Sequence, residues 1–474
     1  MTTAREALWV TRPKRCRPSL LTGAVILAVA LGAAIAAVHW AALALAGLAV
    51  VVVAGLILFR LDLAVAVLAA TFFFNAYLTH GVGIFTIDKA IGALAVMAWG
   101  LEWAVGHRPV LGTRQLWLVG AFLLWTGVSI VVARNDRAAL ITSLRYVTFA
   151  TLFFLVIQTV RGDRRRADVL VTVVVAAAAV ASLIGLVGFF GHHAARASGP
   201  INDPNDFGFV LASSVPLGIY QVRWAATRWG KAIWSVALVL ILACTLATFS
   251  RSALAGLGIA SLWALWTRRL RLRWLLAVVA CLVAAGGVAS LATPQLVQTA
   301  FGEKAHVATQ NVAVRSGYYR VELNEWEHHP ITGVGPGNFV YRFYQFAPVA
   351  QESLPFPSNV QTISGEEAYL VILAEQGAPG LALFLGYLAL SWAELRRRFP
   401  TDQRSDQLQS AMAAGFVVAC VGALFLAEQF YPPLWFLPAL AASLASGVPG
   451  AGSGDLRDVT SNHPEAARVA GGDG

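Results

Sequence analysis

Three arginines lie where a guanidinium group could bind an anion. Arg251 separates two long apolar runs that have almost no linker between them, and Arg315 begins an amphipathic stretch in a long polar segment. Arg196 precedes a turn-rich segment that contains Asn205, a possible further ligand. Guanidinium groups stay charged and bind phosphate oxygens in pairs. We therefore predict a phosphate clamp, with solvated loop charges or snorkelling side chains as the plainer alternative.

Carboxylates form the second group of candidates. Glu366 and Glu367 lie where the chain returns to an apolar run, and either could act as a general base or orient a hydroxyl group. Two acids at a helix start could instead only complement the helix dipole. Glu375 lies further along the same run, where an ionisable group is a functional candidate or could pair with Arg145 to hold a bundle together.

Three more polar residues are possible site residues in the same polar segment. His328 and His329 directly precede Pro330, where a helix is expected to end, and Arg320 lies one to two turns after Arg315. Histidines at a helix end are more often structural than catalytic. We predict no metal or disulfide, because the four cysteines are scattered and form no Cys-x-x-Cys motif or Cys/His cluster.

Long apolar runs must position these residues. The chain of 474 residues is 58% hydrophobic and only 13% charged, which excludes an ordinary soluble protein. A membrane span needs about 20 apolar residues, and the runs are continuous rather than alternating. We predict an all-α fold, a polytopic transmembrane helix bundle of about 12–14 spans. The apolar segments are 19–38, 40–59, 63–79, 86–105, 115–133, 139–160, 167–191, 206–222, 232–250, 252–267, 274–292, 366–393, 407–427 and 430–447.

The basic residues predict the orientation of these spans. Of the 35 Lys and Arg residues, 25 fall in alternate connections and the two ends of the chain, and only 9 fall in the other connections. Cytoplasmic loops carry the excess of basic residues, so both termini are predicted to be cytoplasmic. The net charge of +10 then reflects topology, and no nucleic-acid partner is expected. Arg196, Arg251 and Arg315 fall on the outer side.

One long polar segment interrupts the spans and is predicted to lie outside the cytoplasm. It is rich in proline and aromatic residues, so we expect an ordered loop with short helices, one from Arg315 to His329, followed by a turn from Gly333 to Phe339. The expected organisation is a basic cytoplasmic N-terminus at 1–18, a transmembrane bundle at 19–292, the large extracytoplasmic loop at 293–365, the continued bundle at 366–447 and a disordered cytoplasmic tail at 448–474.

Four blocks, in order, resemble the O-antigen ligase and polymerase superfamily of bacterial membrane glycosyltransferases. The segment from Arg196 to Gly208 resembles the family's Arg-to-Asn-Phe-Gly segment, and Ser250-Arg251 resembles its Ser-Arg turn. Arg315, with Pro330 and Gly333 to Phe339 after it, resembles the loop block. The segment from Glu366 to Gly380 resembles the block that re-enters the membrane, but ligases have His-Asn where this chain has Glu366-Glu367.

This resemblance implies a function. The family transfers glycans from a polyprenyl diphosphate such as undecaprenyl diphosphate, on the outer face of the bacterial plasma (inner) membrane, during cell-envelope polysaccharide biosynthesis. It implies no cofactor, no metal and no nucleotide sugar, and its partners are the lipid-linked donor, a glycan or other hydroxyl acceptor, and membrane lipids. Arg196, Arg251 and Arg315 would bind the donor diphosphate, and Glu366 or Glu367 would act on the acceptor.

Several functions remain open at this point. The main hypothesis is a polymerase that joins repeat units of a surface polysaccharide. A ligase would instead transfer a finished glycan to a lipid, protein or wall acceptor. A transporter or flippase belongs to another class, and it would typically show paired inverted repeats with broken helices, which the sequence does not suggest.

Overall fold

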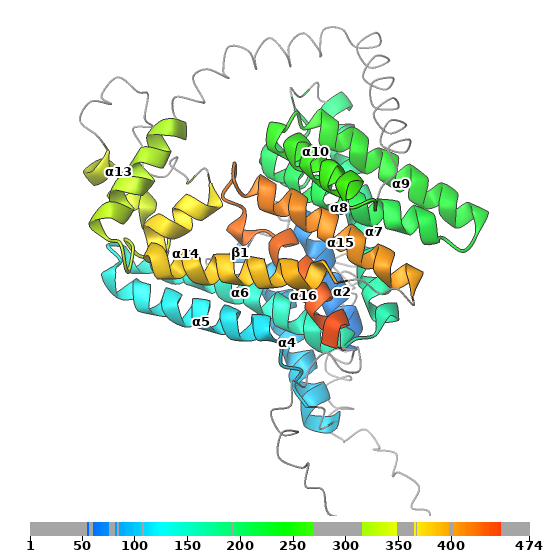
Figure 1. Ribbon diagram of the computed structural model, residues 1–474, viewed down its shortest axis with the longest axis horizontal. Helices are drawn as coiled ribbons and strands as arrows, with labels where there is room; N and C mark the ends of the chain where they lie inside the picture. Colours follow the sequence, from blue (N-terminus) through cyan, green and yellow to red (C-terminus); the bar gives the residue numbers. More distant parts are fainter. Residues whose placement is uncertain are drawn as a thin grey trace, which may run out of the picture. The chain divides into compact units, whose positions relative to one another are not determined.

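The structure is a computed structural model in which helices joined by short turns dominate (Figure 1). Met1–Phe59 form one unit of the chain, and Arg60–Gly474 form a second, which carries every element named below. The residues that the structure describes are 55, 60–74, 81–82, 85–106, 109–191, 194, 196–269, 315–347, 365, 367–397 and 402–446.

The helices coincide with the predicted apolar segments. Each of the other predicted segments contains a helix in its described part, while 19–38, 40–59 (apart from Gly55), 75–79 and 274–292 lie outside the described residues. The fold class, a helical membrane bundle, is confirmed. The helices are α2 (Leu61–Thr71), α4 (Ile87–Gly106), α5 (Arg114–Ser129), α6 (Asp136–Val160), α7 (Arg164–Gly191), α8 (Pro204–Trp224), α9 (Arg228–Ala247), α10 (Arg251–Trp266), α13 (Phe339–Phe346), α14 (Ala368–Leu395), α15 (Gln403–Gly422) and α16 (Pro433–Ser446).

Smaller elements connect these helices. The chain is helical at 315–328, as predicted for the loop, and turns follow until α13, a second short helix that the sequence analysis did not locate. The described residues also include three short 3₁₀ turns and one two-stranded antiparallel ladder: η1 (Phe72–Phe74), η2 (Ile130–Val132), η5 (Glu428–Phe430), β1 (Gly81–Val82) and β2 (Phe85–Thr86).

Polar side chains fix where the helices begin. Asn135 accepts a hydrogen bond from the backbone N–H of Ala138 over 3.0 Å at the start of α6. Asp203 caps α8, whose first residue is Pro204, and Ser250 caps α10. A side-chain oxygen at this position satisfies one of the backbone N–H groups that a helix start leaves without a partner. Short caps between apolar runs therefore produce tight connections between the helices.

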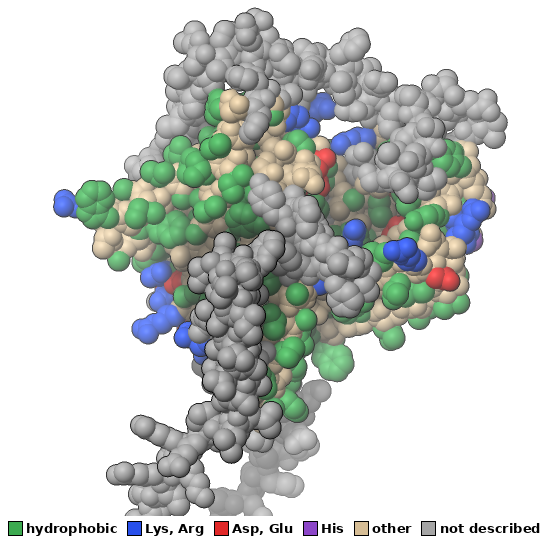
Figure 2. Space-filling view, turned by 180° about the vertical axis from the view of Figure 1, so that it is seen from behind, with side chains coloured by type: hydrophobic (Ala, Val, Ile, Leu, Met, Phe, Trp, Pro, Cys, Tyr) green, Lys and Arg blue, Asp and Glu red, His purple; other side chains and the backbone are tan. Residues whose placement is uncertain are grey.

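Among the described residues, five helices are long and apolar enough to cross a membrane. They are Arg114–Val132, Asp136–Val160, Arg164–Gly191, Arg228–Ala247 and Ala368–Leu395, and Leu61–Phe74 and Pro433–Ala445 are shorter apolar helices. Large apolar side chains such as Trp117 and Leu124 are exposed on the bundle, and hydrophobic side chains cover much of the surface in Figure 2. An exposed apolar surface of this kind suits a lipid environment, and the chain is a multi-pass membrane protein.

Connections that were predicted to share a membrane side lie at the same end of the bundle. At one end Arg164 forms an ion pair with Asp402 over 2.9 Å, and Arg404 forms one with Asp168 over 2.9 Å. The N-termini of α8, α10 and α14 lie at the other end, which we call the arginine end because Arg196 and Arg251 lie there. The alternation of the helices agrees with the predicted spans, and the orientation of the two ends stays a prediction.

Candidate functional site

Arg196 is held by neutral acceptors at the arginine end. Its Nε donates to the carbonyl oxygen of Thr248 over 2.8 Å, and its Nη2 donates to Oδ1 of Asn205 over 2.6 Å. The hairpin between α9 and α10 and the start of α8 therefore fix this half-buried guanidinium together. Burial lowers the pKa of Arg196, the carboxylate of Asp203 opposes this effect, and the charge of Arg251 lowers the pKa further.

Arg251 is the first residue of α10 and is exposed. Arg196, 55 positions earlier in the sequence, binds the carbonyl oxygen of Thr248 in the hairpin that leads into Arg251, so both arginines lie at this hairpin. Neither arginine forms an ion pair with a carboxylate among the described residues. Two like charges held together without a paired carboxylate provide a ready site for an anion.

The connection between α15 and α16, residues 423–432, lies beside the candidate arginines. Nη1 of Arg315 donates to the carbonyl oxygen of Phe425 over 3.4 Å. The hydroxyl of Tyr431 donates to the carboxylate of Asp206, which directly follows the Asn205 that holds Arg196. The sequence analysis gave this connection no role. Its signal was the polar and aromatic run from Glu428 to Tyr431 before two prolines.

Glu375 lies at a break in α14. Gly377 has φ +69° and interrupts the helix, so the carbonyl groups before it lack their usual partners. The backbone N–H groups of Val334 and Gly335 donate to the carbonyl oxygens of Ala374 and Glu375, each over 2.9 Å. The turn after residues 315–328 thus binds the break in α14, and two blocks of the predicted family pattern are in direct contact (Figure 1).

The side chain of Glu375 also points to this turn. The backbone N–H of Phe339, at the start of α13, donates to its Oε1 over 3.4 Å. No ion pair joins Glu375 to Arg145 among the described residues, although the charge of Arg145 acts on this carboxylate. Glu375 therefore caps α13, which is a positioning role that the sequence analysis did not consider.

Glu367 caps α14. Its Oε2 accepts a hydrogen bond from the backbone N–H of Leu370 over 2.7 Å, and only 6% of the residue is exposed. Glu367 directly precedes the membrane-spanning helix, and burial raises its pKa to about 7 while its backbone hydrogen bonds oppose this shift. A carboxylate with such a pKa can both accept and release a proton near neutral pH. Glu366 lies outside the described residues.

The other predicted candidates occupy the helix at 315–328 and its end. Nδ1 of His328 lies 2.8 Å from the carbonyl oxygen of Asn324, and its ring packs against Phe346. Nε2 of His329 lies 3.2 Å from Nη1 of Arg342, and burial lowers the pKa of His329 with a further contribution from Arg342. Both histidines thus fix the helix end to its surroundings. Arg320 is exposed.

Glu325 is a buried carboxyl group that the sequence analysis missed. The residue is fully buried, and neither carboxyl oxygen has a hydrogen-bond partner among the described residues. Burial raises its pKa to about 10, and the nearby carboxylates of Glu375 and Glu322 contribute to the shift. It is therefore protonated at neutral pH. Within the described ranges, no group of three His, Cys, Asp or Glu side chains is arranged to hold a metal ion.

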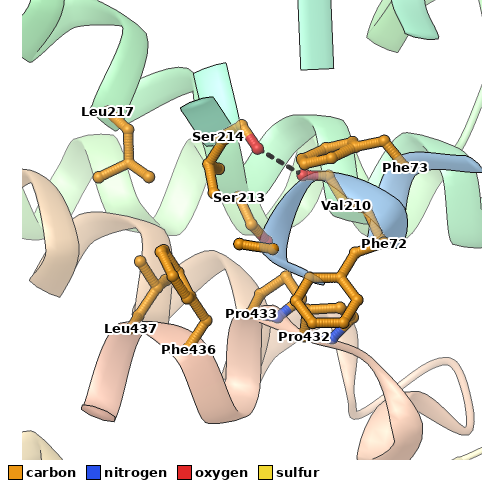
Figure 3. A pocket seen from close by; sticks show the side chains of 12 residues that line it. Phe72, Phe73, Val210, Ser213, Ser214, Leu217, Pro432, Pro433, Phe436 and Leu437 are labelled. Carbon is orange, nitrogen blue, oxygen red and sulfur yellow. Dashed lines mark hydrogen bonds between the residues drawn. The ribbon is translucent and has the colours of Figure 1, made fainter. Parts of the chain in front are cut away.

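A small apolar hollow lies next to the α15–α16 connection (Figure 3). Phe72 and Phe73 of η1, the middle of α8, and Pro432 and Pro433 line it. The hydroxyl of Ser214 donates to the carbonyl oxygen of Val210 over 3.0 Å, so the lining presents few polar groups. Because Pro432 follows Tyr431, the hollow adjoins the polar contacts at the arginine end.

The structure thus brings some predicted residues together and separates others. Arg196, Arg251 and Asn205 form one group, and Arg315 is tied to the same end through the α15–α16 connection. Glu375 and the histidines belong to the packing of the loop against α14. The contacts therefore favour an anion site at the arginine end, next to an apolar hollow.

Comparison with known protein families gives a match over part of the chain. Residues 236–385 match the family described as O-antigen ligase. The match spans most of α9, α10, the loop and the first part of α14, and it includes Arg251, Arg315 and Glu367. No curated protein matches the chain. The order of the motifs, the helical bundle and this match over part of the chain support membership of the O-antigen ligase superfamily.

Proposed function

We propose that the chain is a glycosyltransferase that uses a glycan linked to a polyprenyl diphosphate at the outer face of the bacterial plasma membrane. The arginine end then faces outward and both termini are cytoplasmic, in line with the distribution of basic residues. The observation that carries the proposal is the neighbouring pair Arg196 and Arg251. Both lie at the α9–α10 hairpin, and neither forms an ion pair with a carboxylate among the described residues.

The arginines would stabilise the leaving group. In the reaction an acceptor hydroxyl oxygen attacks the anomeric carbon, and the bond between that carbon and the diphosphate oxygen breaks with inversion. The electron pair of the broken bond stays on the diphosphate, whose negative charge therefore grows. Cationic groups that are already in place stabilise such charge without reorganisation. Arg196, Arg251 and Arg315 are positioned for this role in the proposal, with Asn205 as a polar partner of Arg196.

A carboxylate would receive the hydroxyl proton. Glu367, with its pKa raised to about 7 by burial, is the described group best suited to this step. Glu366 is its neighbour in the chain and an equivalent candidate. The helix-capping hydrogen bond at Leu370 would fix the Glu367 side chain while it acts.

The first part of the lipid chain would lie against the apolar surface beside the hollow in Figure 3. Phe72, Phe73 and Pro433 contribute to an apolar lining beside the α15–α16 connection, as an isoprenoid chain requires. The diphosphate would then lie near Tyr431 and Arg196, and the glycan would lie under the loop. The proposal thus separates the lipid, the diphosphate and the glycan along one path.

Within this class we favour a polymerase that joins repeat units of a surface polysaccharide. The resemblance to ligases fails at Glu366 and Glu367, where those enzymes have His-Asn. A change at the residues that handle the acceptor hydroxyl indicates either a different acceptor molecule or a different group that receives the hydroxyl proton. The donor chemistry, which depends on the arginines, stays the same.

A deletion strain tests the proposal. We expect undecaprenyl diphosphate carrying single repeat units to accumulate at the outer face, where an added glycosidase can reach it. Accumulation of lipid-linked polymer would instead identify a ligase, and accumulation at the cytoplasmic face would identify a flippase. Either result would overturn the polymerase assignment.

A further inference from the structure

Arg145 is an arginine within a membrane-spanning helix. It lies nine positions after Asp136, the first residue of α6, or about 13 Å along the helix at 1.5 Å per residue. The residue is exposed in the structure. An arginine at this depth is costly unless it faces a water-filled space or a partner of opposite charge. Its surroundings must therefore explain why it is there.

The exposed apolar face of α6 points in another direction. Leu140, Leu144 and Val147 are exposed and share one side of the helix. Successive helix residues are about 100° apart, so Arg145 is rotated by about that angle from Leu144. Phe149, one turn after Arg145, packs against Trp435 of α16. Arg145 thus lies toward the interface of α6 with α16 rather than on the lipid-facing side.

The guanidinium of Arg145 lies over the ring of Phe430, 5.7 Å from its centroid. Phe430 directly precedes Tyr431, whose hydroxyl binds Asp206. Arg145 and the first turn of α8 therefore contact consecutive residues of the α15–α16 connection. Since Asn205 in that turn holds Arg196, one short segment links Arg145 to the arginine end.

Described carboxylates do not neutralise Arg145. Within the described parts of the chain it forms no ion pair, and the carboxylate of Glu375, on which its charge acts, instead caps α13. A cation–π contact with one phenylalanine compensates only part of the cost of placing a charge at this depth. The position calls for an anion that is not part of the described chain.

We propose that Arg145 is a further binding residue for the diphosphate of the lipid-linked donor. This inference rests on the proposed function and extends its anion site from the ends of α8 and α10 to the side of α6. Arg145 would contact the diphosphate from the side of α6, next to Phe430, while Arg196 and Arg251 contact it from the arginine end. The α15–α16 connection, with Phe430 beneath the guanidinium, would hold Arg145 in place.

Binding of undecaprenyl diphosphate to the purified full-length protein in detergent tests this role, with undecaprenol as the uncharged probe. The wild-type protein should bind the diphosphate more tightly than the alcohol. Arg145→Met keeps an unbranched side chain that can pack on Phe430 but removes the charge. It should weaken diphosphate binding by about 10- to 100-fold, as expected for lost hydrogen bonds to a charged group, and leave undecaprenol binding unchanged.

Three further variants separate binding from structural support. Arg145→Lys should recover part of the affinity because the charge returns without the paired donors. Arg137→Met, which removes an exposed arginine from the first turn of the same helix, should bind like the wild type. Phe430→Leu removes the cation–π contact and keeps the charge, so it should retain most of the affinity. Thermal unfolding of each purified variant verifies that it is folded.

The outcomes distinguish the two proposals. If wild-type protein does not prefer undecaprenyl diphosphate to undecaprenol, the proposed function fails and the role of Arg145 fails with it. If the wild type has this preference and folded Arg145→Met keeps it, only the role of Arg145 is overturned. Equal losses in Phe430→Leu and Arg145→Met would also overturn it, because Arg145 would then act only by holding the α15–α16 connection.

Discussion

Tyr431 donates a hydrogen bond to the carboxylate of Asp206 and so ties the α15–α16 connection to the first turn of α8. The two residues are 225 positions apart in the sequence. Asp206 follows Asn205, which holds Arg196, and the same connection accepts a hydrogen bond from Arg315 at Phe425. Elements from both halves of the chain therefore determine the geometry of the proposed anion site.

The clamp predicts that lysine cannot replace arginine at this site. Arg251→Lys and Arg315→Lys should each lower kcat/KM by at least about tenfold, nearly as much as the alanine variants, because lysine keeps the charge but loses the paired donors. Transfer from purified lipid-linked donor to acceptor measures this effect.

A matched arginine provides the control for the lysine variants. Arg228 is the first residue of α9, as Arg251 is of α10, and it is exposed at the end of the bundle away from the arginine end. Arg228→Lys should retain wild-type activity. Full activity of Arg251→Ala and Arg315→Ala, at normal protein amounts in the membrane, would contradict the clamp. Both arginines would then serve only to set the membrane topology.

The proposed role of Glu367 as a general base predicts that turnover depends on pH. A general base acts in its deprotonated form, and burial raises the pKa of this carboxyl to about 7. Turnover should therefore fall as the pH decreases from 8 to 6 and approach a plateau above the pKa. Glu367→Gln should cost about 10²–10⁴-fold in kcat, leave donor binding intact and remove this pH dependence.

The glutamine variants also separate catalysis from capping. A glutamine carbonyl oxygen can still accept the hydrogen bond from Leu370, so Glu367→Gln should unfold at nearly the wild-type temperature. Glu366→Gln and the double variant show which carboxylate acts. Wild-type turnover in the double variant would show that neither carboxylate acts as a base, and catalysis would then depend on positioning of the acceptor hydroxyl.

Cysteine labelling checks the orientation of the bundle. In a background without the four native cysteines, Arg165→Cys and Arg397→Cys should react with an impermeant reagent only after the cells are permeabilised. Gln310→Cys should react in intact spheroplasts. Protection of position 310 in intact spheroplasts would contradict the outward orientation and the chemistry that depends on it.

Replacing Gly377 is predicted to lower the stability of the protein strongly. Its φ of +69° is strained for other residues, and a methyl group there would overlap the carbonyl oxygen of Ile331. Gly377→Ala should lower the free energy of unfolding by about 1–3 kcal/mol from backbone strain, and the overlap adds to this loss. Gly386→Ala in the same helix should be neutral or stabilising, because the nearest atom to the added methyl group is 3.9 Å away. Thermal unfolding in detergent compares the two variants.

The sequence was sufficient to predict the helices but not how α14 is built. Continuous apolar runs of membrane length leave few alternatives to a helix, so the segments agree closely with the structure. The predicted segment 366–393 was treated as uninterrupted, although Gly377 and Pro379 carried a signal for a break. Residues 330–335 and Trp125 of α5 bind the backbone at the break, and such long-range partners cannot be read from periodicity.

The candidate site, like α14, was only partly predicted from the sequence. Arginines at tight connections between apolar runs are unusual, so their residue type and position made Arg196 and Arg251 recognisable. The acceptors that orient Arg196 come from two other segments and follow from packing. Glu375 was predicted as a functional or pairing residue, yet its contact with Phe339 depends on α13, which the sequence analysis did not locate.

The break in α14 has a consequence for how the protein is made. The carbonyl oxygen of Gln376 accepts a hydrogen bond from Trp125 over 2.8 Å, and those of Ala374 and Glu375 accept theirs from the turn at Val334 and Gly335. In a bilayer without these partners, three backbone carbonyl groups would lack hydrogen bonds. During synthesis α5 and the turn precede α14, so its partners are already available when it inserts. An isolated loop fragment, in turn, would lack the surface that orders its turn.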